Sequence, residues 1–216
     1  MTELRVGGLS PLSSCDWPGE LAATIFCQGC PWDCRYCHNQ SLRPACGPQR
    51  IPWAEIVDFL ARRRALLDGV VFSGGEPTLQ AALPQAIREV RAMGFKIGLH
   101  TAGPYPERLK AVLPLVDWVG FDIKAPFPDY ARITKAAGSG EKASESLRHL
   151  LQSGVAYQVR TTVHPSLLDE AALAWLKEDL AGRGVRGHVL QKFRREGCVD
   201  PELVAGAGLG MTHISA

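Results

Sequence analysis

The sequence predicts an α/β fold: a partial (β/α)6 barrel of the TIM type, in which six strand-then-helix units surround a parallel sheet with helices. Three observations support this prediction. Short apolar runs alternate with longer amphipathic runs, glycine or proline ends many of them, and polar side chains recur where the predicted strands end. Six units make an incomplete relative of the eightfold barrel, whose active sites lie at the carboxyl ends of the strands.

The elements of the first half follow from apolar patterning and its interruptions. The strand at 70–72 stops at a glycine pair, and Gly94 follows residues 79–93 where a helix C-cap is expected. Residues 53–67 carry apolar side chains at helical spacing. In order, we predict strand 22–26, helix 53–67, strand 70–72, helix 79–93 and strand 96–101.

The second half continues the same alternation. Gly154 closes one predicted helix, and His164 with Pro165 ends the strand before the last helix. In order, we predict helix 107–113, strand 118–123, helix 141–153, strand 157–163, helix 169–180 and strand 188–193.

Length and composition limit the class of protein. The 216 residues suit a single domain over 1–216, with a core at about 20–195 and a loose tail at 196–216. Apolar residues make up 46% and the net charge is +2, which excludes a disordered chain and gives no reason to expect a nucleic-acid or membrane partner. No signal peptide and no span of ~18 apolar residues is evident, so we expect a cytoplasmic protein.

Polar residues at the ends of the predicted strands indicate a catalytic rim. Asp122 and Lys124 lie two residues apart at the end of one strand, so they share a face, and an ion pair is the simplest account of them. The other strand ends carry Cys27, Ser73 to Glu76, His100, Thr101, Arg160, Thr162, His164, Gln191 and Lys192.

Four of the seven cysteines lie within eleven residues, at positions 27, 30, 34 and 37. Disulfides rarely persist in the cytoplasm, so this crowding indicates a metal or a cluster. The spacing leaves three interpretations open: a four-cysteine zinc site, a ferredoxin-type carrier, or a cluster on the last three cysteines with one iron open to a ligand. We expect Cys15, Cys46 and Cys198 to be structural.

The segment Cys30-Pro-Trp-Asp-Cys34-Arg-Tyr-Cys37 resembles the C-x3-C-x-aromatic-C signature of radical S-adenosylmethionine (SAM) enzymes. The resemblance implies that Cys30, Cys34 and Cys37 hold a catalytic [4Fe-4S] cluster, whose fourth iron is chelated by SAM. It also implies a place for Tyr36 near the adenine of SAM. Cys27 falls outside the signature, and we expect it to be a buried thiol.

The turn Ser73-Gly74-Gly75-Glu76-Pro77 resembles the Gly-Gly-Glu motif of the same family, which binds the methionine amino group of SAM. The resemblance implies that the two glycines let backbone approach the cofactor. Glu76 would either accept from the ammonium group or orient the turn.

The next three strand ends resemble those of activases, the enzymes that activate glycyl-radical enzymes. His100 precedes Thr101 at the position where activases commonly have an aspartate, which in some of them helps to bind a monovalent cation. Imidazole is a poor ligand for such a cation. The alternative is that His100 is a hydrogen-bonded rim residue. Asp122 and Lys124 resemble the Asp-x-Lys pair near cofactor and substrate, and Arg160 lies where activases have an arginine. The resemblance implies cofactor binding by Thr101, Asp122, Lys124 and Arg160.

The N-terminal stretch, with Gly8-Leu-Ser-Pro and Asp16-Trp-Pro-Gly19, is similar to that of the activases of anaerobic ribonucleoside-triphosphate reductase and of pyruvate formate-lyase. The implied function is an oxidoreductase that cleaves SAM reductively and installs a glycyl radical on a partner, expected to be that reductase. Flavodoxin or ferredoxin would donate the electron. Two alternatives stay open: a small radical SAM enzyme acting on a metabolite, such as one resembling 7-carboxy-7-deazaguanine synthase, and a non-enzymatic iron–sulfur or zinc interaction module.

Overall fold

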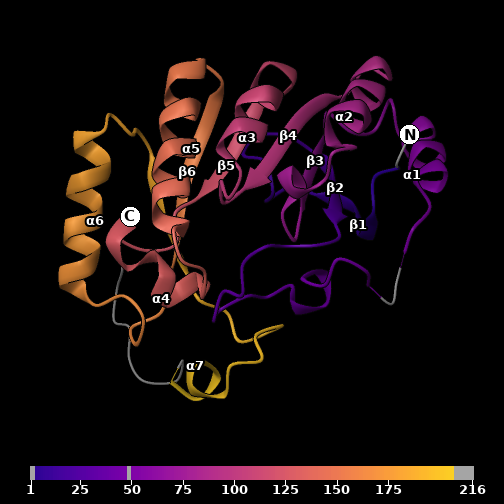
Figure 1. The fold of residues 1–216 in the computed structure, drawn as a ribbon. Helices are drawn as coiled ribbons and strands as arrows, with labels where there is room; N and C mark the ends of the chain where they lie inside the picture. The colour runs from indigo at the N-terminus through magenta and orange to yellow at the C-terminus, as the bar shows by residue number, and fades with distance from the viewer. Residues whose placement is uncertain (1–2, 48–49, 207–216) are drawn as a thin grey trace.

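A seven-stranded sheet forms the centre of the protein (Figure 1), in a computed structural model that describes residues 3–47 and 50–206. The strands are β1 (Val6–Ser13), β2 (Ala22–Cys27), β3 (Gly69–Gly74), β4 (Lys96–Thr101), β5 (Trp118–Asp122), β6 (Ala156–Val163) and β7 (His188–Lys192). β2 to β7 are parallel and follow one another in chain order, whereas β1 pairs antiparallel with β2. Within the described residues β7 does not pair with β1, so the barrel is open and the predicted partial barrel is confirmed.

The longer helices cover one face of the sheet: α1 (Trp53–Ala61), α2 (Leu83–Ala92), α3 (Pro106–Val112), α5 (Ser139–Ser153) and α6 (Glu170–Gly182). Two short helices, α4 (Tyr130–Thr134) and α7 (Pro201–Gly206), lie instead against the segment that contains Asp33 and Arg35. Figure 1 shows α2, α3 and α5 side by side along the sheet. Alternate strand residues such as Phe72, Leu99 and Phe121 are fully buried, in one core with Ile87 of α2 and Leu109 of α3. Strands buried in this way read as short continuous apolar runs, as the sequence shows.

The other face of the sheet is filled at its amino-terminal end by Trp17. Its ring stacks on Trp118 with centroids 5.7 Å apart, in a small cluster with Ala22 and Val71. A Cβ atom on Gly98 would lie 2.9 Å from the Trp17 ring, so glycine is needed there. Because Trp17 occupies the amino-terminal end, the polar rim at the carboxyl ends is left for the candidate site.

The structure corrects several predicted elements. β1 was not predicted, although it belongs to the sheet, and α1 ends at Ala61 rather than at residue 67. The expected loose tail is wrong for residues 196–206, because α7 lies there with Leu203 fully buried; the rest of that tail falls outside the described residues. No helix in the described part of the chain is long and apolar enough to cross a membrane.

Candidate active site

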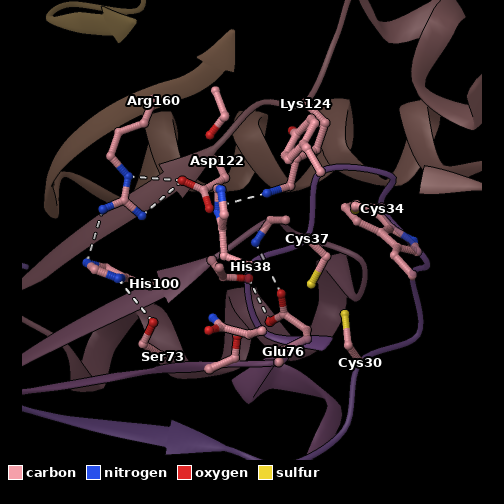
Figure 2. Close-up of a pocket in the computed structure, with 18 of the residues that line it drawn as sticks. Cys30, Cys34, Cys37, His38, Ser73, Glu76, His100, Asp122, Lys124 and Arg160 are labelled. Atoms are coloured by element: carbon pink, nitrogen blue, oxygen red, sulfur yellow. Dashed lines mark hydrogen bonds and ion pairs between the residues drawn. The ribbon is translucent and has the colours of Figure 1, made fainter. Parts of the chain in front are cut away.

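The carboxyl ends of β2 to β6 surround a pocket of roughly 990 Å³, its open mouth included (Figure 2). Every residue that the sequence marked as a site residue lines this pocket: Cys30, Cys34, Tyr36, Cys37, Gly74, Gly75, Glu76, Thr101, Asp122, Lys124 and Arg160. These residues come from five separate segments of the chain, so the fold brings together residues that lie far apart in the sequence. The size suits a cofactor-sized ligand.

The cysteine-bearing loop after β2 is fixed by backbone hydrogen bonds at both of its sides. Cys30 N donates to Arg43 O at 3.0 Å, which closes the loop on itself. Asp33 N donates to Thr134 O at 2.9 Å and Arg35 N donates to Ile133 O at 3.1 Å, so α4 supports the backbone on both sides of Cys34. The thiols are therefore held on the pocket wall by backbone, not by side-chain packing alone.

The arrangement of the thiols argues against a single zinc ion. Tetrahedral zinc with sulfur at 2.3 Å requires neighbouring sulfurs about 3.8 Å apart. Among the described residues, no three cysteine sulfurs lie within 4.8 Å of one another. Three pocket-lining thiols spread more widely suit a multi-iron cluster, which cysteine thiolates hold in proteins. Cys27 is fully buried at the end of β2 and does not line the pocket, as expected of a structural thiol.

Burial favours the protonated form of two of the pocket thiols. It raises the pKa of Cys30 to about 12 and that of Cys34 to about 11. Thiolates are the metal-binding form, so a bound metal would displace these protons.

The glycine turn packs directly against the cysteine loop. Gly74 has a φ of +109°, in the region that favours glycine, and a Cβ atom there would meet the backbone of Cys27. A Cβ atom on Gly75 would meet the carbonyl oxygen of Gly29. Both glycines therefore allow the turn to approach the loop that carries the thiols.

Glu76 ties this turn to the end of β4. Its Oε1 accepts from Thr78 N at 3.0 Å, from Thr78 Oγ1 at 2.5 Å and from Thr101 Oγ1 at 2.7 Å, and its Oε2 accepts from Ala102 N at 3.1 Å. Burial raises the pKa of Glu76, although these bonds favour the carboxylate. Four protein donors already serve this side chain, and this favours the orienting role over direct capture of an ammonium group.

Three charged side chains form the opposite wall. Asp122 Oδ1 lies 2.9 Å from both Nε and Nη2 of Arg160, and Oδ2 lies 3.3 Å from Lys124 Nζ. Burial alone would raise the pKa of Asp122, but Arg160 and then Lys124 outweigh it and hold the pKa well below its usual range. One carboxylate faces two cations, so the predicted ion pair exists and leaves a positive charge beside the pocket.

His100 is a neutral rim residue. Its Nε2 lies 2.7 Å from the Asp16 carbonyl and must donate to it, while Nδ1 lies 3.2 Å from Ser73 Oγ and accepts from it. Arg160 Nη1 lies 3.2 Å from Nε2, where two donors face each other. Burial and this guanidinium lower the pKa of His100 to about 4. The hydrogen-bonded alternative for this residue therefore accounts for its contacts.

The comparison with known families decides the class of protein. The pattern of the radical SAM superfamily matches residues 24–177 of the chain. The chain belongs to the radical SAM superfamily. This family uses a [4Fe-4S] cluster and SAM, and solved relatives of the fold hold SAM.

Relatives within the superfamily narrow the class. The chain is 31% identical to a glycyl-radical enzyme activating enzyme of Methanocaldococcus jannaschii, over 91% of this chain and 83% of the relative. It is 30% identical to the pyruvate formate-lyase-activating enzyme of Clostridium pasteurianum, over 76% of this chain and 71% of the relative. This radical SAM protein is thus an enzyme of the class that activates glycyl-radical enzymes. A 7-carboxy-7-deazaguanine synthase of Methanopyrus kandleri is 29% identical over half of each chain, 50% and 51%.

Solved structures show the same fold. Streptococcus suis SuiB bound to its precursor peptide SuiA matches with a TM-score of 0.62 and 9% identity, over 80% of this chain and 39% of that one. The structure of anSMEcpe with bound AdoMet matches with a TM-score of 0.63 and 16% identity, over 81% of this chain and 50% of that one. The chain therefore spans half or less of these larger proteins, and the likeness concerns the fold.

The residues of this radical SAM enzyme suit the cofactors of the family. The three thiols can hold a cluster, and the spare positive charge at Lys124 and Arg160 suits an anionic group such as a carboxylate. Tyr36 is almost fully buried in the pocket wall, and its hydroxyl has no hydrogen-bond partner within the described residues. Such an unsatisfied buried group is what a bound ligand can satisfy.

Sequence reasoning assigned no role to some pocket residues. Asp16 contributes the carbonyl that orients His100, and Ala102 contributes the N–H that holds Glu76. Both act through the backbone, so their side chains gave no signal. Trp32 also lines the pocket, inside the cysteine signature that was recognised for its thiols alone.

Proposed function

We propose that this enzyme installs a glycyl radical on a partner protein, with Cys30, Cys34 and Cys37 holding a [4Fe-4S] cluster that leaves one iron for SAM. The single observation that carries the proposal is the convergence of all eleven predicted site residues on one pocket at the strand ends. When bound, the cluster and SAM supply a radical that abstracts hydrogen.

The protein's part is to position and shield these groups. Glu76 and the two glycines of the turn set the path of backbone beside the cysteine loop. Lys124 and Arg160, held by Asp122, supply the positive charge for an anionic group of SAM. Trp32 and Tyr36 are buried on the cysteine side, where they limit the access of water.

A macromolecular substrate fits the architecture. The sheet is open between β1 and β7 in the part of the chain that the structure describes, so a loop of another protein could enter at that flank. The narrower proposal is that the partner is anaerobic ribonucleoside-triphosphate reductase, on the strength of the N-terminal resemblance at Gly8 to Pro11 and Asp16 to Gly19. Flavodoxin or ferredoxin would supply the electron, since the sequence shows one cluster motif.

The test begins with an oxygen-free protein reconstituted with iron and sulfide. Dithionite-reduced enzyme should convert SAM to 5′-deoxyadenosine, and Cys34→Ala should not, whereas Cys198→Ala, outside the signature, should retain the activity. Adding a candidate glycyl-radical enzyme from the same organism should produce its doublet signal in electron paramagnetic resonance. A loaded cluster that never cleaves SAM would overturn the enzymatic proposal, and the absence of a doublet with every such partner would overturn the activase proposal.

A second candidate function is action on a small metabolite. The similarity to 7-carboxy-7-deazaguanine synthases of two organisms, over about half of this chain or less, favours it. In that case 5′-deoxyadenosine would form without any glycyl radical, and 7-carboxy-7-deazaguanine would be the product to seek by mass spectrometry.

A further inference from the structure

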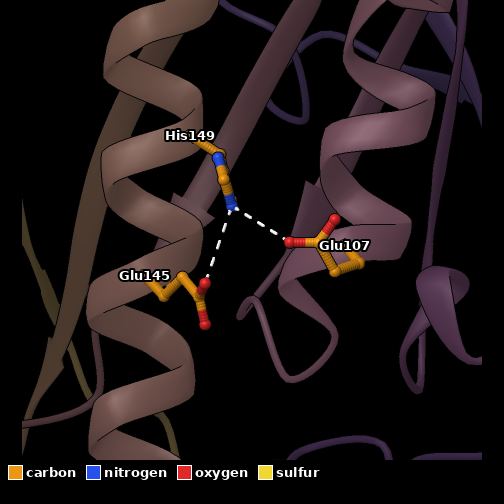
Figure 3. A group of neighbouring side chains, drawn as sticks. All are labelled: Glu107, Glu145 and His149. Carbon is orange, nitrogen blue, oxygen red and sulfur yellow. Dashed lines mark ion pairs between the residues drawn. The ribbon is translucent and has the colours of Figure 1, made fainter.

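Three metal-ligating side chains converge between α3 and α5, away from the active-site pocket (Figure 3). Glu145 and His149 occupy positions i and i+4 of α5 and so share one face, and Glu107 lies in the first turn of α3. One ligand atom from each residue lies within 4.8 Å of the other two. No other group of this kind is found among the described residues, and none of the three lines the active-site pocket.

His149 is the fixed member of the group. Its side chain is only 7% exposed, and its Nε2 lies 3.6 Å from Glu107 Oε1 and 3.9 Å from Glu145 Oε1. These distances are too long for hydrogen bonds, so the ring points at both carboxylates and is bonded to neither. The glutamates are 77% and 49% exposed and can move. A fixed nitrogen thus faces two adjustable oxygens.

We propose that Glu107, Glu145 and His149 bind a zinc ion, with water in the fourth position. Zinc takes nitrogen at about 2.0–2.1 Å and carboxylate oxygen at about 2.0–2.2 Å, which places tetrahedral ligand atoms about 3.4 Å apart. Each carboxylate would approach His149 Nε2 by about half an ångström or less, from 3.6 and 3.9 Å. The carboxylate oxygens, which lie within 4.8 Å of each other, would close by about 1.4 Å at most. An imidazole with carboxylates suits zinc, whereas calcium and magnesium are bound mostly through oxygen.

Arg148 is the competing cation. Its Nη2 lies 3.8 Å from Glu145 Oε1 and 3.5 Å from His149 Nε2, while its Nη1 donates to Gln152 at 3.1 Å. One guanidinium against two carboxylates leaves a negative charge that a divalent ion would balance. Zinc would compete with Arg148 Nη2 for Glu145 and His149, while Nη1 could keep its contact with Gln152. Replacing Arg148 would remove this competitor, so zinc binding should become stronger.

The ion would brace a segment that supports the active site. Ser146, next to Glu145, donates from Oγ to the carbonyl of Gly103 at 2.8 Å. The segment from Gly103 leads into α3, and Ala102 just before it holds Glu76. Zinc would therefore join α5 to the start of α3, behind the backbone that orients the glycine turn.

The test uses the cluster-loaded enzyme, so that the pocket thiols are occupied, with the exposed Cys15 and Cys46 changed to serine in all samples. Zinc bound per chain is measured by equilibrium dialysis and mass spectrometry of the metal. Glu145→Gln should weaken zinc binding at least tenfold, and the same is expected of Glu107→Gln. The matched control is Glu141→Gln, an exposed glutamate of the same helix outside the group, which should bind zinc as the parent does.

A second readout is the thermal midpoint, which zinc should raise in the parent and the control but not in the two glutamine variants. Arg148→Gln should bind zinc more tightly than the parent. Equal zinc binding by parent and Glu145→Gln, or no zinc bound by the parent at millimolar concentration, would overturn the proposal. The glutamates are exposed, so their replacement tests ligation without disturbing the core, and cleavage of SAM by the same samples reports separately on the proposed function.

Discussion

The charged wall of the pocket makes a strong prediction for Asp122→Asn. Within the part of the chain that the structure describes, Asp122 is the only carboxylate that pairs with Arg160 and Lys124, and the substitution removes it. The side chains of Arg160 and Lys124 are 10% and 14% exposed. Breaking a buried pair costs about 3–5 kcal/mol because a charge is left without a partner, and the 31% exposure of Asp122 places the loss near 3 kcal/mol. For a chain of this size that lowers the melting temperature by about 6–12 °C.

The assay is thermal unfolding followed by circular dichroism, without oxygen and at equal iron content. The matched control is Asp179→Asn, whose exposed i,i+4 pair with Arg183 measures 2.8 Å and is worth about 0.3–0.5 kcal/mol. The pKa of Asp122 is lowered, so this carboxyl group stays ionised at every pH near neutrality. Its stabilising effect is present above about pH 3.9, the pKa of an aspartate in the unfolded chain, and is lost only in strong acid. If Asp122→Asn costs no more than Asp179→Asn, the charges are solvated and the argument for a preformed anion site is wrong.

Three further predictions concern the supports of the site. Glu76→Gln turns an amide donor toward the N–H of Ala102 and should cost about 1–3 kcal/mol in urea unfolding; an unchanged midpoint would contradict the bridging role. The pKa of His100 is lowered in the folded protein, so the unfolded chain binds more protons below pH 6.5. The free energy of unfolding should therefore fall by on the order of 2 kcal/mol from pH 6.5 to 5. His100→Gln should remove this contribution to the pH dependence of stability. Asp200→Asn removes the 2.8 Å pair with Arg35 of the cysteine loop, so a chelator should strip iron several-fold faster; equal rates would show that this ion pair does not restrain the loop.

The central parallel strands β2, β3 and β5 were predictable because nearly all of their residues are buried, which gives them continuous apolar runs. β4 lies at 96–101, as predicted, and β6 begins one residue before the prediction. β1 was missed because its sequence, Val6 to Ser13, contains two glycines and a proline, which strands disfavour. Its place at the sheet edge and its irregular register tolerate them.

The missed helices are short and owe their existence to tertiary contacts. α4 and α7 have five and six residues, too few for a periodic pattern. α4 exists where its carbonyls receive the N–H groups of Asp33 and Arg35, and α7 where Leu203 is buried. α1 shows the opposite error, since apolar spacing continued to Leu67 after the backbone had left the helix.

The two walls of the pocket also differed in how far the sequence could predict them. The thiol wall comes from one contiguous motif, so the crowding of cysteines indicated a metal or a cluster, and the resemblance to a known signature favoured the cluster. The charged wall comes from β5 and β6, and only their register brings Asp122 opposite Arg160. Asp122 holds the guanidinium by two contacts, each 2.9 Å long. An anionic ligand would therefore meet cations that need little reorganisation, the condition under which electrostatic binding is strongest. The thiol wall differs, because Cys30 and Cys34 must lose their protons before a metal can bind. Of the two cofactors, the cluster is therefore the one whose binding requires a change of protonation in this pocket.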